Sequence, residues 1–241
     1  MKPVRIACIG CGFIGRRHME NAAHMEGIEI GAFADLNLPA AEALQKEFGR
    51  GYATSDPKTV LADPDIDAVV IATHHDSHTP LALQAAAARK DILMEKPLAL
   101  NVEECRSIAQ AVRAAGIAFT MNFKFRFAPA VMRAREMVSS PVVTHGQLAM
   151  ERMPDDSWVR DPVRGGGLIL ATACHVLDMI CWLNQSEPVR VYAEAGRGAD
   201  AVVATVRFAN SSVASLLLAD CGEDSHSGKW LHEIFDGERS A

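Results

Sequence analysis

A short glycine loop near the N-terminus, Gly10-Cys11-Gly12-Phe13-Ile14-Gly15, limits what this chain can fold into more than any other feature. Residues 4–9 before it are rich in β-branched side chains and predict a buried strand, and residues 16–25 after it predict a helix. A tight glycine turn between a strand and a helix aims backbone N–H groups and the positive end of the helix at one point. A diphosphate suits that point, so the loop predicts a dinucleotide-binding unit.

Each glycine of the loop has its own predicted role. Gly10 permits the turn, Gly12 lets the backbone approach the phosphates, and Gly15 lets the helix pack closely on the strand. The next apolar strand, residues 28–34, is followed by Asp35, twenty residues after the last glycine of the loop. A carboxylate there can accept hydrogen bonds from the adenosine ribose hydroxyls. A glycine turn that binds nothing is the alternative, and the order of strand, loop, helix, strand and acid argues against it.

The identity of the dinucleotide follows from the residues around Asp35. A 2′-phosphate would lie beside this carboxylate and be repelled by it. The next residues, Leu36 and Asn37, supply no arginine to neutralise such a phosphate. NAD is therefore expected as the cofactor in preference to NADP.

The pattern of the chain changes near residue 122. Up to that point short apolar strands alternate with helices, which predicts an α/β Rossmann domain, a doubly wound parallel sheet, over residues 1–122. Residues 123–241 predict an α+β domain with a mostly antiparallel, open-faced sheet, including a helix over 165–183. A hairpin turn at Asn210-Ser211-Ser212 joins two of its strands.

Composition bounds the partners and the location. The 241 residues are 49% hydrophobic and 22% charged, which fits one large or two modest domains. The net charge of −6 without a basic run gives no support for a nucleic-acid surface. No N-terminal signal precedes the first strand, and the apolar stretch 165–183 contains His175 and Asp178, so a buried helix is expected rather than a membrane span. Six scattered cysteines fit a reduced, cytoplasmic protein.

Two patterns raise the question of a metal. Cys8-Ile9-Gly10-Cys11 has the spacing of a redox or zinc motif, but it lies in a buried strand and its turn, and no second pair completes a zinc site. The loop 73–78 holds three histidines and an aspartate. Adjacent His74 and His75 cannot easily face one ion, and lining the nicotinamide end is the favoured role. No metal site is expected.

Two residues have the chemistry that hydride transfer requires of a protein. Lys96 follows a buried strand and precedes Pro97, at the sheet edge where the cofactor should lie. His175 lies on the expected helix 165–183 and could take or give a hydroxyl proton while hydride moves. A hydrogen-bonded core histidine is the alternative for His175. In an α-helix, Ala171, His175 and Asp178 would share one face.

Several motifs together carry a family resemblance. They are the glycine loop, Ala72-Thr73 with His78, Glu95-Lys96-Pro97-Leu98-Ala99, Asn122-Phe123 with Arg126, Trp158-Val159-Arg160-Asp161-Pro162, and Gly165-Gly166-Gly167 with His175, Asp178 and Trp182. With these motifs the sequence resembles the glucose–fructose oxidoreductase / inositol dehydrogenase (Gfo/Idh/MocA-like) family over essentially its whole length. The Glu-Lys-Pro motif and the three-glycine helix, at this separation, are far more specific than the glycine loop.

The resemblance implies a fold, a reaction and a set of site residues. The fold is a Rossmann domain followed by an open-faced sheet domain, and the reaction is hydride transfer with NAD or NADP on sugars, cyclitols or related hydroxy compounds. Lys96 and His175 match the catalytic lysine and histidine. The cofactor-binding residues it implies are Gly10, Gly12, Phe13, Ile14, Gly15, Asp35, Thr73, His74, His78, Glu95 and Lys96. The substrate-binding residues it implies are Lys96, Asn122, Arg126, Trp158, Arg160, Thr172 and His175.

The sequence departs from the family pattern at three places. The family commonly has an aspartate at the position of Ala171, which would orient the histidine; Thr172 or Asp178 could take its place. His74-His75 replaces the usual Pro-Asn. Members usually continue beyond the strand at 230–235 with more sheet and a C-terminal helix, so the second domain is expected to be incomplete relative to the family.

The functional prediction is an NAD-dependent dehydrogenase acting on CH–OH groups of a sugar-like or cyclitol-like compound. A dinucleotide-binding regulator without turnover is the alternative from another class, and Ala171 favours it. An NAD-dependent glycoside-cleaving relative is a third possibility. Because the second-domain strands alternate and no helix remains after residue 183 to cover their second face, a homo-oligomer through that sheet is expected.

Overall fold

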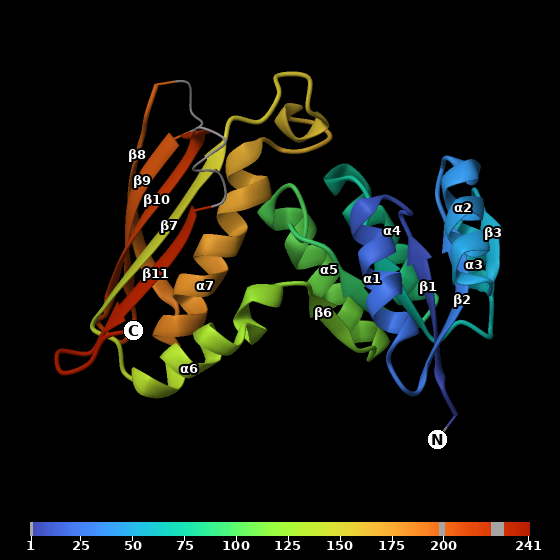
Figure 1. Cartoon of the computed structure of the whole chain (residues 1–241), viewed down its shortest axis with the longest axis horizontal. Helices are drawn as coiled ribbons and strands as arrows, with labels where there is room; N and C mark the ends of the chain where they lie inside the picture. The colour runs from blue at the N-terminus through green and yellow to red at the C-terminus, as the bar shows by residue number, and fades with distance from the viewer. Residues whose placement is uncertain (1, 198–200, 223–228) are drawn as a thin grey trace. The chain divides into compact units, whose positions relative to one another are not determined.

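The computed structural model describes residues 2–197, 201–222 and 229–241. The chain divides into two compact units, Met1–Asn122 and Phe123–Ala241 (Figure 1). Each unit has its own sheet and its own core.

The first unit is built on a six-stranded sheet in which every neighbouring pair is parallel. In spatial order its strands are β3 (Tyr52–Thr54), β2 (Ile28–Ala34), β1 (Val4–Ile9), β4 (Ala68–Ile71), β5 (Asp91–Met94) and β6 (Phe119–Met121). The chain moves outward from β1 to β3, then returns to the centre at β4. The order therefore reverses between β1 and β4, and ligands of such sheets bind outside the carboxyl ends of the strands at this point.

Helices cover both faces of this sheet, each over a separate apolar core. The helices are α1 (Phe13–Ala23), α2 (Leu38–Phe48), α3 (Pro57–Ala62), α4 (His78–Ala87) and α5 (Val102–Ala115), with a 3₁₀ turn, η1, at His75–Ser77. One core contains Met19 of α1, Leu44 of α2 and Phe33 of β2. The other core, on the opposite face, contains Val60 of α3, Leu81 of α4 and Ile108 of α5. The doubly wound fold predicted from the alternation of elements is confirmed.

The second unit is built on a five-stranded mixed sheet. Its strands, in spatial order, are β11 (Lys229–Phe235), β7 (Val143–Glu151), β10 (Val213–Gly222), β9 (Ala201–Phe208) and β8 (Pro188–Ala195). β7 and β10 pair in parallel and the other neighbours are antiparallel. The predicted mostly antiparallel sheet is thus confirmed.

Helix α7 (Cys174–Asn184) lies along one face of this sheet (Figure 1). Val176 and Ile180 of α7 are fully buried in one cluster with Leu148, Leu216 and Phe208 from three strands. The remaining helical segments are η2 (Lys124–Phe127), α6 (Pro129–Met137), η3 (Trp158–Arg160) and the π-helical segment η4 (Ile169–Ala173). None of the described helices combines the length and apolar content needed to cross a membrane.

The expected helix 165–183 differs from the observed one at its start. Gly166 and Gly167 have φ values of 76° and 87°, in the left-handed region, so they form a turn outside the helix. The helical backbone begins at residue 168 and first passes through the π-helical segment before α7. The wider π turn changes the side-chain spacing, so the α-helical spacing assumed for Ala171 and His175 does not hold.

Candidate functional site

The glycine loop of the first unit leaves backbone open where a ligand would approach. A Cβ atom on Gly10 would lie 2.3 Å from the carbonyl oxygen of Ala72, and one on Gly15 would lie 1.9 Å from that of Gly10. A Cβ on Gly12 would meet nothing within 4 Å. Gly10 and Gly15 are therefore required by packing, whereas Gly12 lies beside free space at the start of α1. This geometry fits a diphosphate against first-turn N–H groups.

The Asp35 carboxylate is fixed beside this loop by two backbone donors. The amide of Cys11 donates to Oδ2 and the amide of Asn37 donates to Oδ1, both at 2.8 Å. The carboxylate therefore lies at the carboxyl end of β2 in a set orientation next to the glycine turn. This is the position from which an acid contacts an adenosine ribose.

The segment 73–78 follows β4 at the same edge of the sheet. Thr73 is half-buried and His74 exposed, and the Ser77 hydroxyl donates to the carbonyl oxygen of His74 at 2.6 Å. His78, predicted to bind the cofactor, has no exposed surface. Its Nδ1 hydrogen-bonds to the carbonyl oxygen of Pro97 at 2.7 Å, and its Nε2 lies 3.3 Å from that of Thr73. His78 is therefore directed at the backbone rather than presented to a ligand.

Lys96 is half-buried two residues after the end of β5, between Glu95 and Pro97. The Glu95 carboxylate is buried and accepts hydrogen bonds from His18 Nε2 at 2.8 Å and from Asn122 Nδ2 at 2.6 Å. Burial acts to raise the pKa of Glu95, but the hydrogen bonds from His18 and Asn122 outweigh it and lower the pKa to about 2. Glu95 and Asn122, predicted for cofactor and substrate, thus bind each other beside Lys96.

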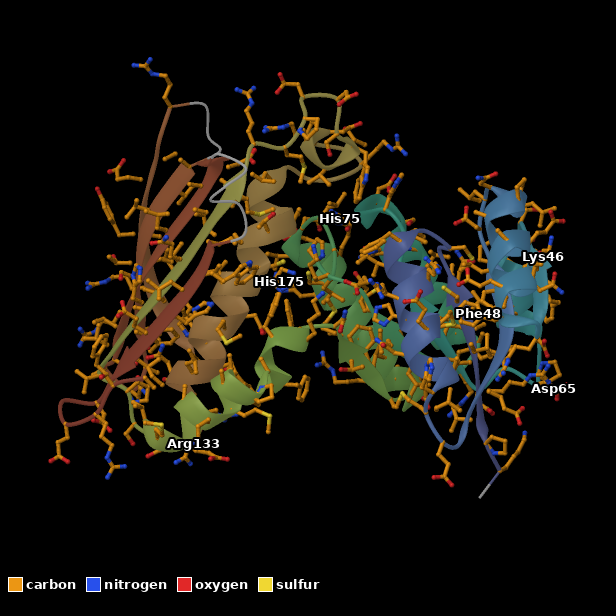
Figure 2. All side chains as sticks on the ribbon, in the orientation of Figure 1. Lys46, Phe48, Asp65, His75, Arg133 and His175 are labelled. Carbon is orange, nitrogen blue, oxygen red and sulfur yellow. The ribbon has the colours of Figure 1, made fainter. Side chains whose placement is uncertain are left out.

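In the second unit, His175 projects from α7 (Figure 2). Its ring is half-buried and meets three aromatic rings edge-on. The ring centroids lie 5.2 Å away for Phe125, 5.7 Å for Trp230 and 6.2 Å for Phe123. The ring contacts restrict the plane of the imidazole without taking a proton from it.

Asp178, considered above as a partner for His175, instead pairs with Arg126. The guanidinium donates from Nε to Oδ2 at 2.8 Å, and Nη2 donates to Oδ1. The hydrogen bond to Asp178 raises the pKa of Arg126. The guanidinium also lies 4.9 Å from the ring centroid of Trp182. Arg126, predicted to bind substrate, is thus engaged by a carboxylate of its own chain, and two charges neutralise each other close to the aromatic rings.

The loop that contains Trp158 and Arg160 is tied to the end of β10. Arg160 donates from Nε to the carbonyl oxygen of Met153 at 3.0 Å and from Nη2 to Asp220 Oδ2. The Asp220 side chain has no exposed surface and also accepts from the Met153 amide at 2.8 Å. The Arg160 guanidinium therefore shapes the loop, while Trp158 is half-buried at the start of η3.

Thr172 lies in η4 and lines a small pocket between this segment and the sheet, with Leu168 and Leu218 among its apolar neighbours. Within the described ranges, no group of three or more His, Cys, Asp or Glu side chains is arranged to hold a metal ion.

Four residues at these sites were not predicted from the sequence. His18, Phe125 and Asp220 were not singled out, and Trp230 was noted only as part of a strand. His18 stands three residues after Gly15, which puts both on one side of a helix, and this spacing could have indicated it. Nothing in the local sequence indicates that Phe125 or Asp220 meets a partner far along the chain.

Comparison with known proteins agrees with this geometry. Residues 4–123 match the model of the oxidoreductase family with an NAD-binding Rossmann fold, and residues 132–227 match the GFO/IDH/MocA C-terminal domain. The chain belongs to the GFO/IDH/MocA oxidoreductase family. The family and its NAD-binding fold, both predicted from the sequence, are confirmed.

Individual relatives are dehydrogenases by name. The chain is 32% identical to an inositol 2-dehydrogenase from Acidothermus cellulolyticus over 81% of this chain and 58% of the relative. It is 30% identical to a levoglucosan dehydrogenase from Pseudarthrobacter phenanthrenivorans over 76% of this chain and 52% of the relative. A solved levoglucosan dehydrogenase in complex with NADH and levoglucosan superposes with a TM-score of 0.91 at 27% identity, over 99% of this chain and 72% of that one. The chain spans less than two thirds of the length of these curated relatives.

Proposed function

We propose that the chain acts as an NAD-dependent dehydrogenase on CH–OH groups of a sugar-like or cyclitol-like compound. The observation that carries this proposal is the open backbone at Gly12 beside the fixed Asp35 carboxylate, in a member of this oxidoreductase family. Relatives named for inositol and levoglucosan support the substrate class.

The residues at the edge of the first sheet fit the dinucleotide. The N–H groups at the start of α1 would face the diphosphate, and Asp35 would accept from the ribose hydroxyls. Phe13 and Ile14, both exposed at the start of α1, and Thr73 and His74 after β4 complete the proposed binding surface. When bound, the nicotinamide accepts or donates the hydride.

Two side chains, Lys96 and His175, are proposed to polarise the reacting oxygen and to transfer its proton. Lys96 would polarise and position the reacting oxygen with its ammonium group. His175 would take the hydroxyl proton during oxidation and return it during reduction. Trp158 and Thr172 are proposed as substrate contacts. Arg126 and Arg160 are already paired with carboxylates, so we assign them to shaping the site around the substrate.

The test is NADH formation across a panel of polyols, sugars and cyclitols. We expect turnover of at least one compound, and loss of about 10³-fold or more in Lys96→Ala and His175→Ala with NAD⁺ affinity nearly unchanged. Calorimetric titration should give tighter binding of NAD⁺ than of NADP⁺. A wild-type protein that binds NAD⁺ but turns over nothing on a broad panel would favour a dinucleotide-binding regulator, and full activity in His175→Ala would overturn the assignment of the base.

We also propose self-association through the outer face of the second sheet. Across this face Leu231, Gln147, Leu217, Val203 and Glu194 lie in one paired row, and the face carries no helix among the described residues. Val203 is 56% exposed and Leu231 43%, so apolar side chains on this face are open to contact.

Light scattering tests the proposed interface. The wild type should be larger than a monomer at micromolar concentration, and Val203→Lys combined with Leu231→Lys should shift it to a monomer. Met25→Lys, at an exposed position of the first unit, is the matched control and should leave the mass unchanged. A monomeric wild type would contradict the proposal.

A cytoplasmic location is the last element of the proposed function. The six cysteines are scattered along the chain rather than spaced as a disulfide framework, a pattern typical of proteins of reducing compartments. Cell fractionation with an antibody to the chain tests this location.

A further inference from the structure

The segment that contains Lys96 is held from two sides by imidazole rings of different elements. On one side His18 of α1 donates to the Glu95 carboxylate at 2.8 Å, and on the other side His78 of α4 bonds to the Pro97 carbonyl at 2.7 Å. Side-chain exposure is 15% for His18 and 11% for Glu95, so water competes little for their hydrogen bond. The residues immediately before and after Lys96 are thus both fixed.

The Glu95 carboxylate is saturated with donors. Its Oε1 accepts from His18 and Asn122, and its Oε2 accepts from the backbone amide of Lys96 at 3.2 Å. With a pKa of about 2, the group is ionised at every pH at which a dehydrogenase is assayed. Glu95 is therefore a permanent anion that orients three donors rather than a group that exchanges protons.

His78 complements this arrangement as a neutral ring. Burial lowers its pKa, so the ring carries one N–H at neutral pH. The shorter of its two contacts, at Nδ1, places that N–H on the Pro97 carbonyl.

His18 differs from the other partners of this segment because of the helix that carries it. The same helix, α1, begins at the open glycine loop where the diphosphate is proposed to bind, and Gly15 packs that helix tightly on the strand end. The hydrogen bond from His18 to Glu95 therefore joins the helix that faces the diphosphate to the residue next to Lys96. One helix therefore contributes both to the glycine loop and to the hydrogen bond on Glu95.

We propose that His18 is a positioning residue which, acting through Glu95, fixes Lys96 relative to the bound dinucleotide. The proposal rests on the proposed function, because it takes Lys96 as the group that polarises the reacting oxygen. Displacement of a reacting group by about 1 Å lowers a rate by about 10²-fold, so a small shift of the Lys96 segment has a large kinetic effect. A purely structural His18 would alter stability and leave the turnover of folded protein unchanged.

Three variants separate these roles. His18→Leu removes the donor, and His18→Gln restores an N–H at about the position of Nε2. His24→Leu is the matched control, because His24 lies exposed at the other end of α1. In His18→Leu we expect kcat to fall about 30-fold to 100-fold, while the NAD⁺ dissociation constant changes less than about threefold. In His18→Gln, kcat should recover to within about fivefold of the wild-type value. His24→Leu should have wild-type kinetics. Unchanged kcat per folded molecule in His18→Leu would overturn the proposal.

A second readout does not depend on turnover. Lys96 is labelled with an amine-acylating reagent and quantified by peptide mass spectrometry, with exposed Lys46 as the internal reference. In wild type and His18→Gln, NAD⁺ should slow labelling of Lys96 several-fold. His18→Leu should label faster without NAD⁺ and lose most of the protection with it. Equal labelling of Lys96 in His18→Leu and wild type would overturn the proposal even if no substrate is found, whereas the expected labelling without turnover would leave the positioning role standing and the dehydrogenase assignment in error.

Discussion

The two proposed catalytic residues are held by different kinds of interaction. Next to Lys96 the chain places a buried anion with three hydrogen-bond donors, whereas around His175 it places the rings of Phe123, Phe125 and Trp230. Hydrogen bonds to a buried charge are directional and leave an expensive unpaired group when one partner is removed. Ring contacts depend on shape and lose energy gradually. The surroundings of Lys96 should therefore be sensitive to changes of charge, and those of His175 to changes of volume.

Removing the anion should have the largest effect. Glu95→Leu leaves the donors of His18 and Asn122 buried without their acceptor, and we expect the first unit to lose about 3 kcal/mol of unfolding free energy. Glu95→Gln keeps an acceptor oxygen and should lose less than half of that. The measurement is urea denaturation, monitored by hydrogen exchange in peptides of the glycine loop. Glu103→Leu, at an exposed position of α5, is the control; an equal loss there would contradict the distinction between the two regions.

The two units should also respond to acid in different pH ranges. The folded pKa of Glu95 is about 2 against an ordinary 4.5, so its stabilisation is complete above pH 4.5 and is lost as the pH falls towards 2. His232 of β11 has both ring nitrogens buried without a hydrogen-bond partner among the described residues, and burial, helped by His145, lowers its pKa from 6.5 to about 4. Between pH 6.5 and 4 the unfolded state binds a proton that the folded state does not, so the second unit loses stability as the pH falls through this range. Each window corresponds to about 3 kcal/mol.

Fluorescence separates these windows, because all three tryptophans, at 158, 182 and 230, lie in the second unit. The tryptophan signal should report destabilisation between pH 6.5 and 4, ahead of the change in the first unit. His232→Leu should abolish the dependence in that range and raise the unfolding free energy of the second unit at pH 5. A second unit whose stability is flat between pH 6.5 and 4 in the wild type would contradict this prediction.

The smallest effect is expected when one ring beside His175 is replaced by a smaller side chain. Phe125→Leu removes an edge-on contact and should lower the stability of the second unit by about 1 kcal/mol. Turnover should fall about fivefold, because the imidazole is less firmly oriented. Phe127→Leu is the matched control, since Phe127 lies two residues away on η2 and is 70% exposed. Equal effects of the two substitutions would show that ring contact with His175 does not matter.

The sequence predicted those parts of the fold that local patterns determine. The glycine loop, the strand that ends before Asp35 and the alternation up to residue 122 all depend on neighbours along the chain. The three-residue strand β3 was not predicted because Tyr52–Thr54 is too short to show a period. The parallel pairing of β7 with β10 joins strands about seventy residues apart. The sequence of neither strand indicates which other strand it pairs with.

The candidate site was predictable as residues but not as contacts. Lys96 and His175 were identified from their places on a strand end and a helix. The partners of the remaining side chains depend on long-range packing: Arg126 meets Asp178, and Asn122 meets Glu95. The π-helical segment η4 was missed because its apolar sequence, Ile169–Ala173, suits an α-helix equally well.

The boundary between the units falls between two consecutive residues that serve different halves. Asn122 donates to Glu95, and the ring of Phe123 lies 6.2 Å from that of His175. A genetic crossover between these two codons would join the first unit of one parent to the second unit of another. The hydrogen bond from Asn122 to Glu95 would come from the first parent, and the ring contact of Phe123 with His175 from the second. Recombination at this point therefore keeps the internal contacts of each half unbroken.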